Sequence, residues 1–296
     1  MANVITDAET NLITADDMKK VREVDFTRKF THDSLDKFME IIGVTRKIPM
    51  MEGTTLYVYT VEGTLEDGAV PEGEIIPLSE YEQTKTAVGE ITLKKWRKAA
   101  SAEAIKKSGL NAAVRETDAK MLKDVQADVR TDLFTFINGT ITGSTSVSGA
   151  DLQKALAAAW GQLQVKFEND AVEPCYFVNP LDVATYLGNA SITTQQAFGM
   201  NYIEDFLGLG TVVMTSLVTQ GTFVATAKEN FIMYYLTMSG DLADSFDLTT
   251  DQTGFIGINS GYANKDRAQV ESLVMDGIKI LVEYAAGVVK GTINPM

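Results

Sequence analysis

The sequence predicts an α+β fold, and three patterns lead to this prediction. Apolar side chains recur at helical spacing over residues 111–138, and β-branched and aromatic residues gather at 54–61 and 90–98. After residue 150, helix and strand patterns mix without the regular alternation of a doubly wound fold. With 296 residues, the chain exceeds a typical domain of about 100–200 residues, so one large domain or two interlocked domains are expected.

Residues 1–31 are polar and weakly periodic, which predicts an arm with only a short helix starting near Asp16. A definite helix follows, because its apolar residues fall at helical spacing: Leu35, Phe38, Met39 and Ile42. Asp33 and Asp36 suit its cap and first turn, and Gly43 suits its end.

Two predicted strands, 54–61 and 90–98, flank a long polar segment. Residues 66–86 read EDGAVPEGEIIPLSEYEQTKT and contain two of the six prolines of the chain. The sequence therefore predicts a hairpin with a large loop at its tip. Because an isolated two-stranded hairpin is marginally stable in water, this hairpin is expected to lean on another surface.

Charge is distributed unevenly along this hairpin. Between Ile48 and Thr84 there are eight acids and no Lys, Arg or His, whereas residues 94–98, KKWRK, hold four cations. The two groups are either solvated faces or complementary patches that meet between identical copies, head to tail. The contact candidates are Glu66, Asp67, Glu72, Glu74, Glu80, Glu82, Lys94, Lys95, Arg97 and Lys98.

The pattern at residues 111–138 predicts a helix about 40 Å long that ends at Gly139. Its expected core positions are Val114, Leu122, Val125, Val129 and Leu133. The small residues of GTITGSTSVSGA, 139–150, predict a linker and an internal boundary.

Further elements follow the linker. A second amphipathic helix is expected to bury Leu152, Ala155, Leu156, Ala159, Trp160, Leu163 and Phe167. CYFV at 175–178 predicts a buried strand, and Asn179 and Pro180 predict the cap and first residue of another helix. Strands are predicted at TVVMTSLV, GTFVATA, NFIMYYLTM, GIKILVEY and GVVKGTI, with residues 228–230 as a tight turn between the second and third.

Bulk composition excludes several classes of protein. The formal net charge of −14 disfavours general binding to nucleic acid, and no apolar run reaches the roughly 18 residues of a membrane helix. The first residues have no apolar signal core, and the single cysteine excludes an internal disulfide. A protein of a reducing cytoplasm is expected.

Catalytic signatures are not found in the sequence. His32 is the only histidine and is expected to be solvated or to cap a helix, and Cys175 opens an apolar strand, which predicts a buried inert thiol. GLGT at 208–211 lacks the remaining residues of a phosphate-binding loop. Asp241, Asp244, Asp247 and Asp251 miss the order of a calcium loop, so a solvated loop is expected. The sequence predicts no catalytic, metal or cofactor site.

Four phrases and the order of the elements resemble a known family. The phrases are GAVPEGEIIPLS at 68–79, KKWRKAASAEAIKKSG at 94–109, CYFVNPLDVATYL at 175–187 and VVMTSLVTQGTFVATAKENFIMYY at 212–235. Together with the arm, the long hairpin and the long helix, they make the chain similar to the major capsid proteins of tailed bacteriophages with the Hong Kong 97-type fold. The resemblance covers nearly the whole chain.

The resemblance implies a domain organisation. It comprises an N-terminal arm (1–32), the start of a peripheral domain (33–53), an extended loop (54–98), the peripheral domain with its spine helix (99–146), an axial domain (147–252), and C-terminal strands that complete the peripheral domain (253–296). In this family the extended loop lies across a neighbouring subunit, which would shelter the hairpin.

The resemblance also implies partners and a location. They are hexamers and pentamers of the chain itself, a portal protein, packaged double-stranded DNA bound without sequence specificity, and no membrane, in a virion assembled in the bacterial cytoplasm. Because the first helix begins by Asp33 with Met1 already in place, a separate scaffolding protein is expected. Some members cross-link through a loop lysine; Lys85 lies near the loop tip, and no motif identifies its partners, so this chemistry is left open.

Two alternatives of other classes are considered. An encapsulin-like compartment shares this fold and encloses enzyme cargo, but residues 1–31 lack a strong amphipathic cargo-binding helix. A hydrolase or lyase with paired carboxylates rests only on the abundance of acids. Neighbouring terminase and portal genes would favour a phage, and a peroxidase or ferritin-like gene would favour a compartment.

Overall fold

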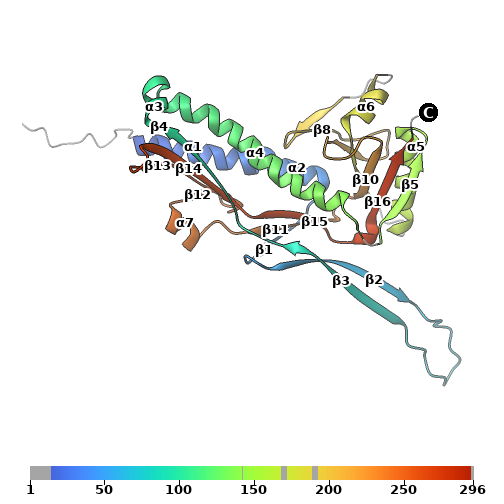
Figure 1. Ribbon diagram of the computed structural model, residues 1–296. Helices are drawn as coiled ribbons and strands as arrows, with labels where there is room; N and C mark the ends of the chain where they lie inside the picture. Colours follow the sequence, from blue (N-terminus) through green and yellow to red (C-terminus); the bar gives the residue numbers. More distant parts are fainter. Residues whose placement is uncertain (1–14, 142, 168–171, 189–192, 295–296) are drawn as a thin grey trace, which may run out of the picture. The chain divides into compact units, whose positions relative to one another are not determined.

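The computed structural model describes residues 15–141, 143–167, 172–188 and 193–294 (Figure 1). The chain forms two compact units, each built from separate segments. Unit 1 contains the described part of 1–33 with 93–122 and 237–277, and unit 2 contains 34–92, 123–236 and the described part of 278–296. These borders do not coincide with the predicted domain borders at 147 and 252.

Unit 1 holds a four-stranded antiparallel sheet in the order β12-β13-β14-β4. Its elements are α1 (Ala15–Phe30), β4 (Lys94–Ser101), α3 (Ala102–Ser108), the first part of α4 (Leu110–Asn138), α7 (Asp241–Phe246), β12 (Thr249–Thr250), β13 (Ile256–Asn264) and β14 (Gln269–Asp276). Helix α1 packs on β12 and β13. Strand β4 therefore ends one side of the sheet.

Helix α1 is longer than the sequence predicted. It runs from Ala15 into a π-helical turn (η1, Thr31–Leu35) and then into α2 (Asp36–Ile42). Its buried Glu23 accepts hydrogen bonds from Ser260 N (2.6 Å), Ser260 Oγ (2.9 Å) and Thr249 Oγ1 (2.6 Å). The helix predicted near Asp16 is therefore confirmed, and its length was underestimated because a polar side chain, rather than an apolar stripe alone, anchors it to the sheet.

The helix predicted before Gly43 is confirmed. Leu35, Phe38, Met39 and Ile42 are buried, and Gly43 ends the helix with φ 75°. The predicted cap is wrong, because the backbone is already helical at Leu35 and no side chain caps α2. Asp36 lies in the first turn, as predicted, and forms an ion pair with Lys47, at 3.3 Å from Oδ1 to Nζ.

Unit 2 holds three sheets in the described residues: a seven-stranded mixed sheet in the order β5-β16-β10-β6-β9-β8-β7, a three-stranded sheet β1-β11-β15, and the pair β2-β3. Its strands are β1 (Arg46–Met50), β2 (Thr55–Thr64), β3 (Glu80–Glu90), β5 (Thr145–Gly149), β6 (Pro174–Val178), β7 (Gln195–Ala197), β8 (Met200–Ile203), β9 (Thr211–Met214), β10 (Thr222–Ala227), β11 (Phe231–Leu236), β15 (Ile278–Val282) and β16 (Val288–Ile293). Its helices are α2, the rest of α4, α5 (Leu152–Lys166), α6 (Pro180–Leu187) and the 3₁₀ turn η2 (Ala285–Gly287).

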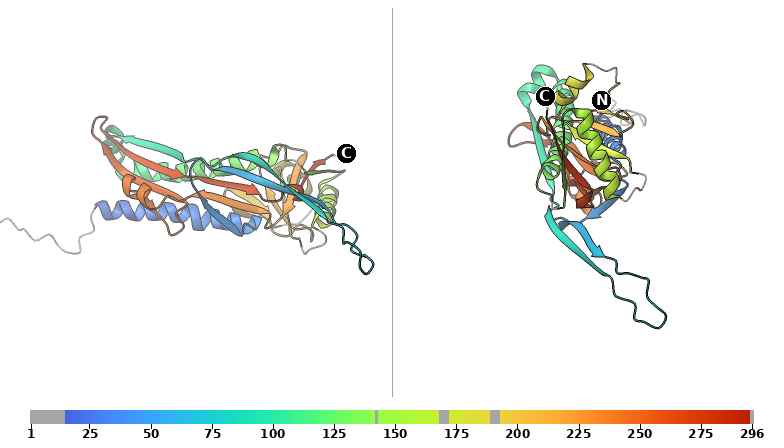
Figure 2. Two further views of the ribbon diagram at one scale, coloured as in Figure 1. Left: turned by 90° about the horizontal axis from the view of Figure 1, so that it is seen from below. Right: turned by 90° about the vertical axis from the view of Figure 1, so that its right-hand side faces the viewer.

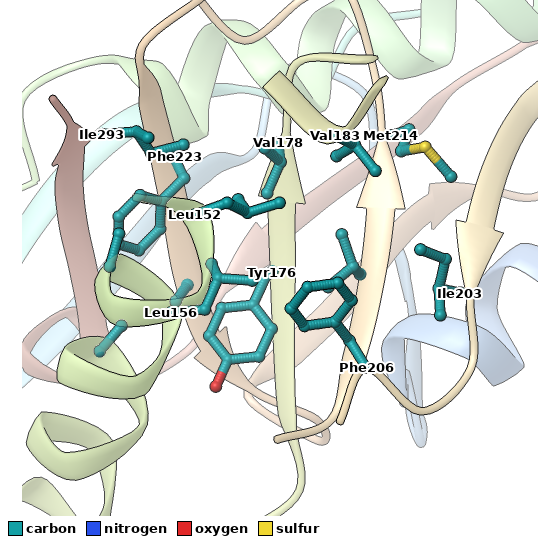
Figure 3. Close-up of a cluster of buried hydrophobic side chains, with 14 of the residues drawn as sticks. Leu152, Leu156, Tyr176, Val178, Val183, Ile203, Phe206, Met214, Phe223 and Ile293 are labelled. Atoms are coloured by element: carbon teal, nitrogen blue, oxygen red, sulfur yellow. The ribbon is translucent and has the colours of Figure 1, made fainter. Parts of the chain in front are cut away.

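One face of the seven-stranded sheet packs against α5 and α6 in a continuous apolar core (Figure 3). Leu152 and Leu156 of α5 meet Tyr176 and Val178 of β6, and all four are buried. Helix α6 begins as predicted, because Asn179 Oδ1 accepts a hydrogen bond from Leu181 N at 3.0 Å with a proline at the first turn. Trp160 was predicted in this core but is 40% exposed.

The tight turn predicted at residues 228–230 is confirmed, with Glu229 at φ 71°, and the two strands that it joins, β10 and β11, belong to different sheets. Strand pairing differs from the sequence prediction at two other places. Residues 145–149 of the predicted linker form β5, which pairs in parallel with β16. Strand β16 therefore completes the seven-stranded sheet instead of a sheet of the C-terminal strands, because it lies between β5 and β10.

Helix α4 confirms the predicted long helix and most of its described stripe. Val125, Val129 and Leu133 are buried, whereas Leu122 is only partly buried. The side chain of Val114 lies outside the described residues. Next to the stripe, the buried Phe134 packs edge-on against Phe177 of β6, with ring centroids 5.2 Å apart. The second half of α4 is thus part of the core of unit 2.

Candidate intersubunit surfaces

The predicted hairpin exists, but its second strand was assigned wrongly. Strand β2 pairs with β3, from Thr55 opposite Glu90 to Thr64 opposite Glu80, and residues 94–101 form β4 in the sheet of unit 1. The hydrophobic pattern missed β3 because almost every one of its side chains is exposed. Figure 2 shows this ribbon of two strands and the loop, residues 65–79, that joins them.

The loop exposes two kinds of side chain. The predicted contact acids of the loop and of β3 are all exposed: Glu66, Asp67, Glu72, Glu74, Glu80 and Glu82. Large aliphatic side chains are exposed beside them, and Ile75 and Leu78 reach 94% and 93%. Sequence reasoning missed these residues, although IIPL within an acidic, proline-containing loop could have indicated them. Exposed aliphatic clusters of this kind mark interaction sites or aggregation risks.

A bulge marks the base of the ribbon. The register shifts by one residue between Leu56 and Tyr57, and Gly89 has φ 129°, a conformation that other residues rarely adopt. Lys279 Nζ donates a hydrogen bond to the Glu90 carbonyl at 3.0 Å, and Leu56 and Val58 are buried. The ribbon is therefore anchored at its base, whereas its outer part is exposed.

The four predicted contact cations do not form one patch. Along β4, Lys95 and Arg97 are exposed, and Lys94 and Lys98 lie on the other face and are partly buried. Lys98 forms an ion pair with Asp118 of α4, and Asp118 Oδ2 lies 3.3 Å from Arg22 Nε. Burial lowers the pKa of Lys98, and the hydrogen bond to Asp118 opposes that shift.

Lys98 and Arg97 therefore both have ion-pair partners within their own chain. Arg97 lies 3.6 Å from Glu271 Oε2, and Lys94 stands opposite the buried Asp276 in the register of β4 and β14. Sequence alone treats KKWRK as one charge cluster because it does not show that strand alternation divides the side chains. Contacts between the loop acids and these cations stay a prediction.

His32 and Cys175, the two residues considered for catalysis, lie in an exposed helical turn and in a buried strand. His32 is exposed in the π-helical turn, with Nε2 3.9 Å from Asp251 Oδ2. Cys175 is fully buried in β6, as predicted, and burial raises the pKa of its thiol to about 12. In the described residues, no three His, Cys, Asp or Glu side chains are grouped to hold a metal ion. No helix in those residues is long and apolar enough to cross a membrane.

The buried thiol gives a simple chemical prediction. Because the thiolate is the reactive form and the folded pKa lies far above the ordinary value of about 8.5, native Cys175 should not react with a thiol reagent at pH 9. The same reagent should label the chain fully in guanidinium chloride. Since Cys175 is the only cysteine, labelling can be counted by mass spectrometry without a background variant. Complete labelling of native protein at pH 9 would contradict the buried strand.

Comparison with known proteins places the fold. No family model matches the chain, and no curated protein matches its sequence. Among solved structures, the capsid of an empty GTA particle matches with a TM-score of 0.53, 9% identity and coverage of 84% of this chain and 88% of that chain. A chain from Gordonia phage Cozz matches with a TM-score of 0.52, 13% identity and 86% coverage of both chains.

A third solved structure is an encapsulin. The holo-SrpI encapsulin complex from Synechococcus elongatus PCC 7942 matches with a TM-score of 0.50, 9% identity and 86% coverage of both chains. These matches extend over most of each chain. The protein therefore has the Hong Kong 97-type capsid fold.

Proposed function

We propose that this chain is the major capsid protein of a tailed bacteriophage, and that its copies assemble into the icosahedral shell around double-stranded DNA. The fold supports this proposal, because it is shared with the capsid of the GTA particle. The observation that carries it is the ribbon of β2 and β3, whose loop exposes Ile75 and Leu78 almost completely. Such a ribbon gains stability only when another surface covers it.

The proposed chain performs no catalysis. Its proposed partners are further copies of itself as hexamers and pentamers, a separate scaffolding protein, a portal protein and the enclosed DNA. The net charge of −14 suits a shell that surrounds DNA without binding it tightly, because an acidic wall repels phosphates. Assembly in the bacterial cytoplasm and a final location in the virion follow from this proposal.

Assembly of the purified chain tests the proposal. We expect shells when a scaffolding protein from the same genome is present, and heterogeneous rings or tubes when the chain is alone at high concentration. Light scattering after size exclusion and negative-stain electron microscopy measure the products. A monodisperse monomer in both preparations would overturn the proposed function.

An encapsulin-like compartment is the second candidate, because the SrpI encapsulin complex has the same fold. The contents of the natural particle separate the two functions. A phage head should protect double-stranded DNA from nuclease, and a compartment should contain an enzyme in fixed stoichiometry. Nucleic-acid extraction and proteomics of particles purified from the source organism measure both.

A further inference from the structure

The ribbon of β2 and β3 has two chemically different faces. Residues opposite each other in an antiparallel pair share a face, and successive residues alternate between faces. Tyr59 pairs with Lys85, Val61 with Gln83, and Gly63 with Tyr81. We name this side the tyrosine face; its described side chains are Tyr57, Tyr59, Val61, Tyr81, Gln83, Lys85 and Ala87.

The opposite side changes character along its length. At the base, Val58 and Thr86 line a small cavity with Phe136 of α4, so this side is turned toward the core of unit 2. Farther out, the same side carries Glu62 directly opposite Glu82. We name this outer part the acid face; its side chains are Glu62, Thr64, Glu80, Glu82 and Thr84, all exposed.

Large apolar groups are exposed on the tyrosine face. Val61 is 52% exposed and Tyr81 is 63% exposed. Gly63 shapes this surface, because a Cβ at that position would lie 2.2 Å from Cδ1 of Tyr81. The ring of Tyr81 therefore packs over Gly63, where a side chain at position 63 would displace it. Rigid aromatic groups on a flat surface are typical of the centre of a protein interface.

Charge selects the occupant of the tyrosine face. Each copy of the chain has a net charge of −14, so copies repel where acids face each other. The acid face bears Glu62, Glu80 and Glu82, whereas the described side chains of the tyrosine face include no carboxylate and one cation, Lys85. Lys85 Nζ lies 4.9 Å from the centroid of the Tyr57 ring. An acidic surface of a second copy should therefore be repelled less by the tyrosine face than by the acid face.

We propose that the tyrosine face docks on a second copy of this chain and that the acid face remains in solvent. The proposal rests on the proposed shell function and deepens it, because it names the side of the ribbon and the residues that make the contact. In this proposal the main contact of the ribbon is made by Tyr59, Val61, Tyr81 and Lys85, and not by the loop acids.

A matched pair of double variants tests the proposal in the full chain. Val61→Asn with Tyr81→Ser changes only the tyrosine face, and Glu62→Gln with Glu82→Gln changes the acid face at adjacent positions. The first variant should lower the yield of assembled particles by about tenfold or more, as the loss of central interface contacts does. The second should assemble at the wild-type yield or better. Equal yields for both variants, or a larger loss with the acid-face variant, would overturn the proposal.

Photo-crosslinking identifies the molecule that contacts the tyrosine face and leaves the other contact residues in place. A photo-crosslinking phenylalanine analogue is placed at position 81 in one sample and at position 82 in another. In assembled particles, position 81 should cross-link to a second copy of the chain several times more efficiently than position 82. Cross-links only to a co-expressed scaffolding protein, or preferential cross-linking from position 82, would overturn the proposal.

Assembly of the wild-type chain distinguishes a failure of the proposed shell function from a failure of the tyrosine-face assignment. If the wild-type chain forms no assembly under any condition, the shell function fails. If it assembles and the two faces behave alike, only the assignment of the tyrosine face fails. Melting temperatures of the unassembled variants check that both remain folded. If one double variant is unstable, the cross-linking experiment still tests the proposal, because it changes only position 81 or position 82.

Discussion

Removing residues 66–79 and joining the strands through Asn-Gly should leave the subunit folded and abolish regular assembly. The deletion retains β2 and β3 and takes away only exposed or partly exposed side chains. Shortening this exposed loop lowers the entropic cost of closing it by about 1.4 kcal/mol, so the melting temperature should not fall. Particles should be absent or irregular, because the loop exposes aliphatic groups that need cover from another copy.

Two full-length variants separate the roles of charge and apolar contact in that loop. One replaces Glu66, Asp67, Glu72 and Glu74 by their amides, and the other replaces Ile75, Ile76 and Leu78 by serine. We expect the serine variant to resemble the deletion and the amide variant to assemble. Negative-stain microscopy and sedimentation measure the yield of particles. Regular shells from the deletion variant at the wild-type yield would show that the loop makes no essential contact.

Phe177→Ala should give the largest loss of stability of any single change proposed here. Phe177 is fully buried in β6, with the rings of Phe134 and Phe231 packed edge-on at 5.2 and 5.9 Å. Truncation of a buried phenylalanine costs about 3–5 kcal/mol, which is a large part of the stability of a typical domain. The variant should therefore be insoluble or melt at a much lower temperature.

Two control variants accompany this prediction, one conservative and one at an exposed position. Phe177→Leu retains most of the buried volume and should be much less destabilising. Phe246→Ala removes a ring that is 48% exposed and should change the free energy of unfolding by about 0.5 kcal/mol or less. Urea titrations followed by circular dichroism measure all three. An unchanged midpoint for Phe177→Ala would mean that this aromatic cluster does not support the sheet.

Local signals predicted the elements whose burial has a clear period. Val125, Val129 and Leu133 mark α4, and Asn179 with Pro180 marks the start of α6. The sequence did not predict β3, because a ribbon exposed on both sides has no apolar alternation. Nor did it predict β5, whose serines and glycine read as a linker until β16 pairs with it.

The candidate contact surface was predictable only in part. The acidic loop and its exposure follow from composition, since acids, glycines and prolines favour solvent. The separation of Lys98 from Lys95 depends on strand alternation, and the ion pair of Lys98 with Asp118 depends on tertiary packing. The tyrosine face depends on the register of β2 with β3, which the sequence assigned to the wrong partner strand.

The position of β16 between β5 and β10 has a consequence for the order of folding during translation. Thr145 finds its partner Val289 only after almost the whole chain has been synthesised, and at about 5–20 residues per second this takes about 15–60 s. Until then β5 and β10 present open edges, and the face that binds α5 is incomplete. Nascent chains therefore cannot offer a finished subunit surface. Subunits are therefore expected to associate only after translation has ended and this sheet is complete.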